Sequence, residues 1–302
     1  MNTMDLPIVV GVDGSEPSLR AVDWAADEAA LRGAPLRLVY ASLWDRYEGA
    51  LLAQELGKPL EEVMARDVVG TAEQRARCRR PGLKVTTDVL PEEPEHGLVR
   101  ESSTAVAVVL GCRGRSGLAE ALLGSVSLAV AGHARCPVIV LGGSHDNQAR
   151  SGIRGRIALG VGDKPAPSAG SAGSAGSAAV RFAVEEASLR GVSLDAVRAW
   201  RRSAYAATGH RLLAGERAHL GEHQAADVLE EALRDAPAGL KVDRRAVEGH
   251  PRDALIAVSR EADLLVVGAR RRHGHLGLHL GRVAHGVLHH AACPVAVVPE
   301  PA

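Results

Sequence analysis

Short runs rich in apolar residues alternate along the chain with longer segments in which apolar residues recur at a helical period. In the first half the apolar runs are Ile8–Val12, Leu36–Ala41, Val85–Leu90, Val106–Gly111 and Val138–Leu141. Continuous Val, Ile and Leu runs are typical of parallel strands that are buried on both faces. The segments between them predict helices at Pro17–Arg32, Pro59–Cys78, Pro94–Ser103 and Ser125–His133. This alternation predicts an α/β fold built on a parallel sheet.

The second half of the chain repeats the first. Its apolar runs are Ile157–Val161, Leu194–Ala199, Val242–Val247, Leu264–Gly268 and Val295–Val298. Residues 104–141 match residues 261–298 at a constant offset of 157, so that Gly111 falls on Gly268 and Cys136 on Cys293. A repeat of about 150 residues indicates two copies of one domain. We therefore expect domains at 1–143 and 155–302, joined by a linker at 144–154.

One low-complexity segment interrupts the second copy. Residues 168–176 read SAGSAGSAG. The offset between the copies is 149 at Gly11 and Gly160 and 158 at Ala21 and Ala179, so these nine residues account for the whole difference. Such a composition predicts a flexible insertion that carries no site.

Composition narrows the classes of function. Lys+Arg and Asp+Glu both number 36, which argues against a dedicated nucleic-acid binder, and aromatic residues make up only 2%. No apolar stretch approaches the roughly 20 residues that span a bilayer. The first residues do not have the pattern of a signal peptide, so we expect a cytoplasmic protein without a membrane partner. Cys136 and Cys293 are expected to be reduced side chains of the two cores.

The residues that could carry chemistry follow the first and fourth predicted strands. Asp13 comes directly after the first strand, and a carboxylate there can accept hydrogen bonds from a ribose or a base. In doubly wound sheets, ligands bind beyond the carboxyl ends of the strands. Gly111 and Gly114 would let the backbone approach an anion closely. Ser125 begins a predicted helix, whose N–H groups and dipole favour phosphate.

The spacing of these residues resembles the universal stress protein family. Gly111, Gly114, Gly124 and Ser125 fit the Gly-x2-Gly-x9-Gly-Ser pattern of its ATP-binding members. The opening Gly-Val-Asp-Gly-Ser and the closing Cys-Pro-Val-x-Val also fit. The resemblance covers nearly the whole chain. It implies two tandem Rossmann-like domains (adenine nucleotide alpha hydrolase-like), each with a five-stranded parallel sheet in the order 3-2-1-4-5 and helices on both faces.

The resemblance also implies a ligand, ATP, with Mg²⁺ on its phosphates. Asp13 would contact the adenosine, Val12 would line the base, and the backbone at Ala41 would meet the adenine edge. The phosphates would lie on Gly114, Gly124, Ser125 and the Val126 amide. Arg113 is interpreted either as a phosphate contact or as a solvated charge. The full candidate set is Val12, Asp13, Ala41, Gly111, Arg113, Gly114, Gly124, Ser125 and Val126.

The second copy departs from this pattern. Asp13 corresponds to Gly162 and Ser125 to Arg282. An arginine also stands at the position of Gly114, where it would oppose a phosphate sterically. We therefore expect that the second copy does not bind ATP.

Two other interpretations of the second copy stay open. The arginines of this region could hold another anion, because Arg suits phosphate and carboxylate groups; they are Arg270, Arg271, Arg272 and Arg282. His285 and His289 share a helix face and could form a metal pair, but surface histidines explain them as well.

Three classes of function are compatible with these residues. The first is a nucleotide-dependent regulator in the stress response, in which the first copy binds ATP. No general base or nucleophile stands in the motif, so any hydrolysis or self-phosphorylation should be slow. The second is a nucleotide-independent scaffold for protein partners, and the third is an enzyme acting on an adenylated intermediate. The resemblance further suggests an internal pseudo-dimer joined through Val138–Leu141 and Val295–Val298, and a homodimer of the whole chain is also plausible.

Overall fold

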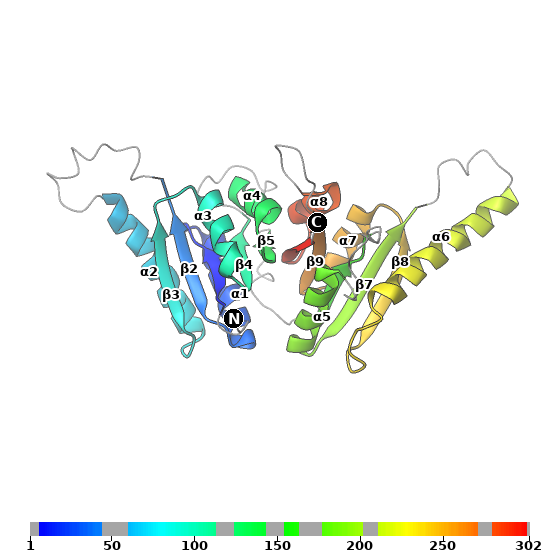
Figure 1. Cartoon of the computed structure of the whole chain (residues 1–302), viewed down its shortest axis with the longest axis horizontal. Helices are drawn as coiled ribbons and strands as arrows, with labels where there is room; N and C mark the ends of the chain where they lie inside the picture. Colours follow the sequence, from blue (N-terminus) through cyan, green and yellow to red (C-terminus); the bar gives the residue numbers. More distant parts are fainter. Residues whose placement is uncertain are drawn as a thin grey trace, which may run out of the picture. The chain divides into compact units, whose positions relative to one another are not determined.

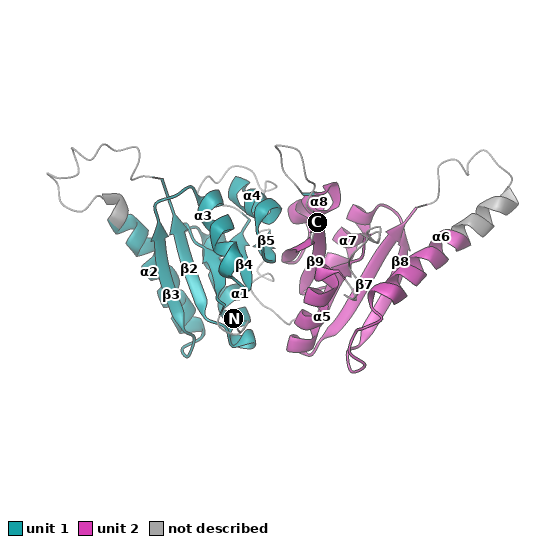
Figure 2. Cartoon of the chain, viewed as in Figure 1, with its two compact units in different colours: residues 1–151, 275–280 teal, residues 152–274, 281–302 magenta. Residues whose placement is uncertain are grey.

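The chain divides into two compact units, which Figure 2 shows in different colours. Unit 1 comprises Met1–Ser151 with His275–Leu280, and unit 2 comprises Gly152–Gly274 with Gly281–Ala302. The computed structural model describes residues 6–43, 60–112, 124–142, 154–162, 177–201, 211–270 and 280–300. The insertion at 168–176 lies outside the described residues. Of the predicted linker only Arg154 is described, and its amide donates to Asp263 Oδ1 of unit 2 at 2.9 Å.

Unit 1 consists of one parallel sheet and four α-helices among its described residues (Figure 1). In chain order its elements are β1 (Ile8–Gly11), α1 (Glu16–Arg32), β2 (Leu36–Ala41), α2 (Leu60–Arg79), β3 (Val85–Leu90), α3 (Pro94–Glu101), a 3-10 turn (Ser102–Thr104), β4 (Ala107–Gly111), α4 (Ser125–His133) and β5 (Val138–Leu141). The strand order is β3-β2-β1-β4-β5. Helix α1 packs on α2, and α3 packs on α4. Right-handed crossovers in this order place the two helix pairs on opposite faces of the sheet.

Unit 2 repeats this architecture. Its elements are β6 (Arg156–Gly160), α5 (Ala178–Arg190), β7 (Ser193–Trp200), α6 (Arg211–Ala232), β8 (Val242–Glu248), α7 (Pro251–Ser259), β9 (Leu264–Arg270), α8 (Arg282–His290) and β10 (Val295–Glu300). The strands are parallel, in the order β8-β7-β6-β9-β10. The two tandem α/β domains predicted from the apolar runs are thus confirmed.

The apolar runs form the cores. Ile8, Leu36 and Ile157 are all 0% exposed, as expected for strands that are covered on both faces. Cys136 and Cys293 are buried free cysteines, and burial raises the pKa of each thiol to about 12. These two cysteines are therefore core side chains, as their positions in the repeat predicted.

Helices α1 and α5 end alike but begin differently. Gly33 and Gly191 close them with the same left-handed backbone, at φ 63° in both. Helix α1 has 17 residues and α5 has 13, so α5 begins one turn later. A serine caps each start: Ser15 Oγ accepts from the amide of Ser18, and Ser177 takes the same role in α5.

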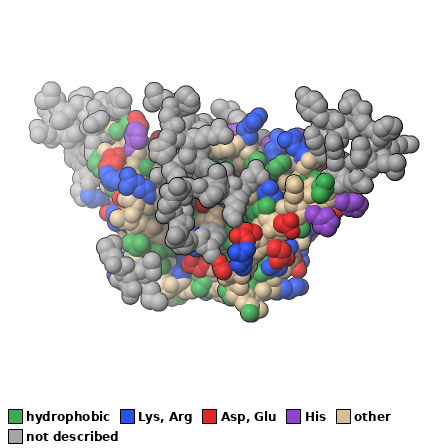
Figure 3. Space-filling view, turned by 45° about the vertical axis from the view of Figure 1, so that its right-hand side comes forward, with side chains coloured by type: hydrophobic (Ala, Val, Ile, Leu, Met, Phe, Trp, Pro, Cys, Tyr) green, Lys and Arg blue, Asp and Glu red, His purple; other side chains and the backbone are tan. Residues whose placement is uncertain are grey.

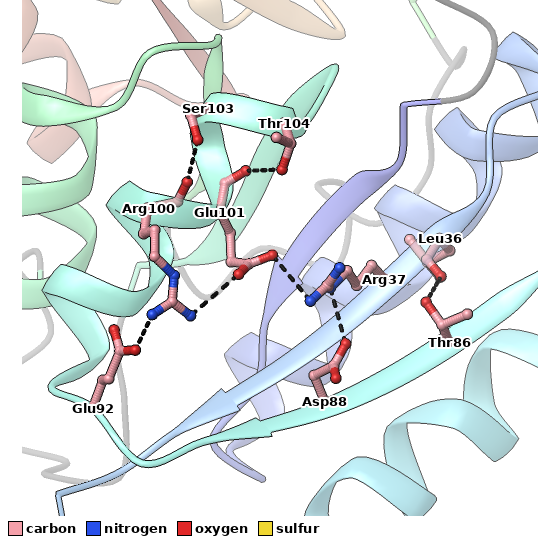
Figure 4. A network of polar contacts seen from close by, with 9 residues as sticks. All are labelled: Leu36, Arg37, Thr86, Asp88, Glu92, Arg100, Glu101, Ser103 and Thr104. Carbon is pink, nitrogen blue, oxygen red and sulfur yellow. Dashed lines mark hydrogen bonds and ion pairs between the residues drawn. The ribbon is translucent and has the colours of Figure 1, made fainter.

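An ion pair between the two outer strands is present in both units with its charges exchanged. In unit 1, Arg37 on β2 forms an ion pair with Asp88 on β3 at 2.9 Å and with Glu101 at 3.3 Å (Figure 4). Asp195 occupies the position of Arg37 in unit 2, and Arg245 that of Asp88, with 2.9 Å between them. The depths differ, because the Asp195 side chain is 0% exposed whereas that of Arg37 is 33% exposed.

The described surface carries basic and acidic side chains interspersed with one another (Figure 3). This mixture agrees with the zero formal net charge of the sequence. Among the helices of the described regions, none is both long and apolar enough to cross a membrane.

Candidate functional site

The carboxyl end of β1 presents Asp13 in a fixed orientation. The Val12 amide donates to the carbonyl of Val39 at 2.9 Å, which continues the ladder one residue past the strand, and the Val12 side chain is buried. Gly14 then has φ 80°, where an L side chain would be strained. Asp13 Oδ1 accepts from the amide of Ser15 at 2.9 Å and from its hydroxyl at 2.6 Å. The described residues bring no donor to Oδ2, which can therefore accept a hydrogen bond from a ligand.

Gly111, the last residue of β4, makes a close approach to the start of α1. A Cβ at Gly111 would lie 2.6 Å from the carbonyl carbon of Pro17, which is closer than real Cβ atoms come. The sequence analysis attributed this glycine to the approach of an anion, and the fold adds a separate reason in helix packing. The contact holds the first turn of α1, which follows Asp13, over the end of β4. The ends of β1 and β4 thereby form one edge.

The start of α4 is tied to the same edge. The Gly124 amide donates to the carbonyl of Cys112 at 2.6 Å, and the Ser127 hydroxyl donates to the carbonyl of Gly111 at 2.7 Å. The residue that caps α4 is Gly124, which has no side chain to occupy the free N–H groups of the first turn. The Ser125 side chain is exposed and Val126 is half-buried. Among the described residues no side chain caps this helix N-terminus, which lies next to the end of β4.

A carboxylate lies beside this helix start. Ser125 Oγ donates to Glu95 Oε1 of α3 at 3.5 Å. The sequence analysis did not include Glu95, which stands 30 residues before Ser125 and approaches it only because α3 packs on α4. One signal was present in the repeat, since Arg252 occupies the position of Glu95 in the second copy.

The described candidate residues all lie at the carboxyl edge of the first sheet. Val12 and Asp13 follow β1, Ala41 ends β2, Gly111 ends β4, and Gly124, Ser125 and Val126 surround the start of α4. Ala41 lies beneath α3, with its methyl 3.6 Å from where a Cβ on Gly97 would be. Arg113 and Gly114 lie outside the described residues. Which of these residues touch a ligand stays a prediction.

In unit 2, the protein's own side chains occupy the equivalent edge. Arg198 of β7 donates to the carbonyl of Gly162, the counterpart of Asp13, at 2.7 Å. Glu300, at the end of β10, accepts from the amides of Ala178 and Ala179, each at 3.0 Å. Its carboxylate therefore caps the shortened α5.

Glu300 also lies against the counterpart of Gly111. A Cβ on Gly268 would be 3.0 Å from Glu300 Oε1. At the equivalent position in unit 1, a Cβ on Gly111 would instead meet the backbone of Pro17. Glu300 thus lies between the start of α5 and the end of β9. Arg282, at the start of α8, is exposed; Arg271 and Arg272 lie outside the described residues.

The histidines of α8 form a pair of neighbouring rings. The ring centroids of His285 and His289 are 4.6 Å apart. Burial lowers the pKa of His285, and the charge of His289 lowers it further. Within the described parts of the chain, no group of three or more His, Cys, Asp or Glu side chains is placed to hold a metal ion.

Comparison with known proteins bears on both halves of the chain. The family model described as "Universal stress protein family" matches twice, at residues 6–142 and 169–299. A universal stress protein of Mycolicibacterium smegmatis is 33% identical over 302 residues, which cover 96% of each chain. Several universal stress proteins of Mycobacterium tuberculosis also match; one is 31% identical over 309 residues.

Solved structures match as well. The crystal structure of a universal stress protein from Archaeoglobus fulgidus covers 97% of this chain and 98% of its own, with a TM-score of 0.67 at 16% identity, so it shares the fold. A second protein from that organism, described as in complex with dAMP, covers 45% of this chain and 98% of its own at 28% identity, with a TM-score of 0.36. Through the double match of the family model and the full-length relatives, the chain belongs to the universal stress protein family, in a tandem form with two domains.

Proposed function

We propose that the protein is a nucleotide-dependent regulator of the stress response, in which unit 1 binds ATP and unit 2 does not. Asp13 would accept hydrogen bonds from the adenosine, beside Val12 and the backbone of Ala41. The phosphates would lie on the start of α4, at Ser125 and Val126. Gly111 and Gly124 would shape this edge, and Gly114 and Arg113 would complete the phosphate loop. Membership of the universal stress protein family supports this assignment.

One observation supports the proposal for unit 1: two kinds of polar group lie at one edge of the sheet, and no side chain of the described residues occupies them. Asp13 Oδ2 is an acceptor with no donor from the described residues, as a ribose hydroxyl or a base amine requires. The N-terminus of α4 supplies N–H donors without a capping side chain, as a phosphate requires. An acceptor and a set of donors at one edge of the sheet match the two ends of a nucleotide.

For unit 2 the same reasoning gives the opposite result. The Arg198 guanidinium bonds the carbonyl at the position of Asp13, and the Glu300 carboxylate lies over Gly268. The Glu300 carboxylate would oppose a phosphate placed over Gly268, and Gly162 has no side chain to accept from adenosine at the position of Asp13. A nucleotide would have to displace bonds that the protein already makes.

Calorimetric titration of the full-length protein with ATP and Mg²⁺ tests this proposal. We expect one site per chain. Asp13→Ala should weaken binding by at least about 10-fold, which corresponds to about 1.4 kcal/mol, and Gly114→Arg should do the same. Asp235→Ala is a matched control, because Asp235 is an exposed aspartate in unit 2. Titration with dAMP measures how much of the affinity depends on the triphosphate.

Each outcome of the titration has a defined meaning. Two sites per chain would contradict the assignment of unit 2. Unchanged affinity in both Asp13→Ala and Gly114→Arg would remove the proposed site. If no nucleotide binds, the nucleotide-independent scaffold becomes the better account of the whole chain. Any hydrolysis of ATP should be slow, since no general base stands among the proposed contacts.

A further inference from the structure

The position of Glu95 is unexpected for a site that binds phosphate alone. Its carboxylate lies 3.5 Å from the hydroxyl of Ser125, at the first residue of α4. The same helix start is where the phosphates would lie in the proposed function. If a phosphate lies on this helix start, it and the Glu95 carboxylate repel each other unless a cation lies between them.

We propose that Glu95 and Ser125 hold the divalent cation that accompanies the nucleotide. This inference rests on the proposed function of unit 1 and identifies which residues of the chain face the metal. Mg²⁺ is typically bound by one or two carboxylates together with substrate phosphates, and it keeps several waters. A serine hydroxyl next to a phosphate-binding helix start is a known additional ligand. Glu95 and Ser125 supply one oxygen of each kind from two packed helices.

Unit 2 provides an internal comparison for this pair. Arg252 replaces Glu95 and Arg282 replaces Ser125, so both positions carry a positive charge. Arg252 also lies along α8, because its Cδ is 2.5 Å from where a Cβ on Gly286 would be. An arginine cannot bind a metal cation. At the position of Asp13, unit 2 has no side chain to accept from adenosine. At the positions of Glu95 and Ser125, it has no oxygen ligand for the cation.

The geometry also determines when the metal binds. No group of three metal-binding side chains exists among the described residues, so Glu95 and Ser125 have to share the ion with the phosphates. Mg²⁺ alone should therefore bind weakly, and the nucleotide and the metal should bind together. A nucleoside monophosphate, with fewer phosphate oxygens, should gain less from Mg²⁺ than ATP does.

The test compares the affinity for ATP in Mg²⁺ with the affinity in a chelator, for the full-length protein and two variants. For the wild type we expect ATP to bind at least about 10-fold more tightly with Mg²⁺. In Glu95→Gln this gain should fall to within about 2-fold, while metal-free affinity stays equal or rises because a negative charge is removed. Glu93→Gln is the matched control; Glu93 is exposed, stands two residues earlier and contacts His96 at 3.3 Å. It should keep the full gain.

A second variant and a second readout keep the test independent of any single result. Glu95→Arg copies unit 2 and should abolish the gain from Mg²⁺ entirely. With Mn²⁺ in place of Mg²⁺, the electron paramagnetic resonance of the ion in the ATP complex should change between wild type and Glu95→Gln.

The outcomes separate this inference from the proposed function. If Glu95→Gln keeps the gain from Mg²⁺ and the Mn²⁺ spectrum, Glu95 does not face the metal, although unit 1 still binds ATP. If the wild type shows no gain from Mg²⁺, the inference fails in the same way. If the wild type binds ATP in neither buffer, the proposed function itself is refuted. Circular dichroism of each variant verifies that the half-buried Glu95 position tolerates the change.

Discussion

The exchanged ion pair allows the effect of burial to be measured within one chain. In unit 2, replacing Arg245 by Met leaves the Asp195 carboxylate at 0% exposure without its hydrogen-bond donor. Its other oxygen, Oδ1, is already buried without a hydrogen-bond partner among the described residues. The nearest remaining cation is Arg156, whose Nη1 lies 3.7 Å from Oδ2. The carboxylate therefore stays buried with one weakened interaction.

Breaking the ion pair should cost more stability in unit 2 than in unit 1. Breaking a buried pair by removing one partner costs roughly 3–5 kcal/mol, and we expect about 3 kcal/mol for Arg245→Met because Arg156 still compensates in part. In unit 1, Asp88→Ala removes the corresponding contact from Arg37. Arg37 is 33% exposed and keeps Glu101 at 3.3 Å, so the cost should be at most about 1 kcal/mol.

Urea unfolding followed by far-UV circular dichroism measures both changes, from the shift in midpoint and the slope. A third variant, Asp195→Leu combined with Arg245→Met, removes both charges and should recover at least half of the lost stability. Equal losses in Asp88→Ala and Arg245→Met would refute the argument from burial. A double variant that is less stable than Arg245→Met would refute the claim that an unpaired buried charge is the cause.

Three further predictions follow from single positions. Glu300→Gln removes the charge that caps α5 and should lower stability by about 1 kcal/mol without altering the ATP stoichiometry. Gly111→Ala should destabilise unit 1 and abolish ATP binding, because its Cβ would clash with Pro17. Gly70→Ala should instead stabilise the protein by about 0.5–1 kcal/mol, because Gly70 lies inside α2 with open space around its Cβ position. Thermal unfolding with and without ATP measures both effects. At about pH 8 a thiol reagent should label the exposed Cys78 but not the buried Cys136. The pKa of Cys136 is about 12, so roughly one thiol in ten thousand is ionised at this pH. Labelling of Cys136 should therefore rise with pH.

The fold was predictable because parallel strands that are buried on both faces have a distinct pattern. The run at Leu36–Ala41 is the observed β2, and the fourth strand begins one residue later than predicted. Val85–Leu90 is the observed β3, although this strand at the edge of the sheet has no buried residue. Such runs depend on burial, which the apolar residues determine locally. Repetition of the pattern at a fixed offset then predicted the second unit without further information.

The candidate site was predictable only in part. The role predicted for Gly111, the close approach of an anion, stays a prediction, and its contact with Pro17 could not be read from the sequence. Glu95, Arg198 and Glu300 were missed, because each is a charged residue whose role depends on which element packs beside it. Comparison of the two copies could have found Glu95, since the charge at that position is reversed in unit 2.

The exchange of charges between the outer strands also bears on how a duplicated chain avoids assembling incorrectly. Two similar halves on one polypeptide can trade strands during folding, and interdomain misassembly is a common failure of repeat proteins. If β8 added to β2 in place of β3, Arg37 would face Arg245. If β3 added to β7, Asp195 would face Asp88. Like charges at these diagonally neighbouring positions of the two strands disfavour both exchanges, so each half selects its own edge strand.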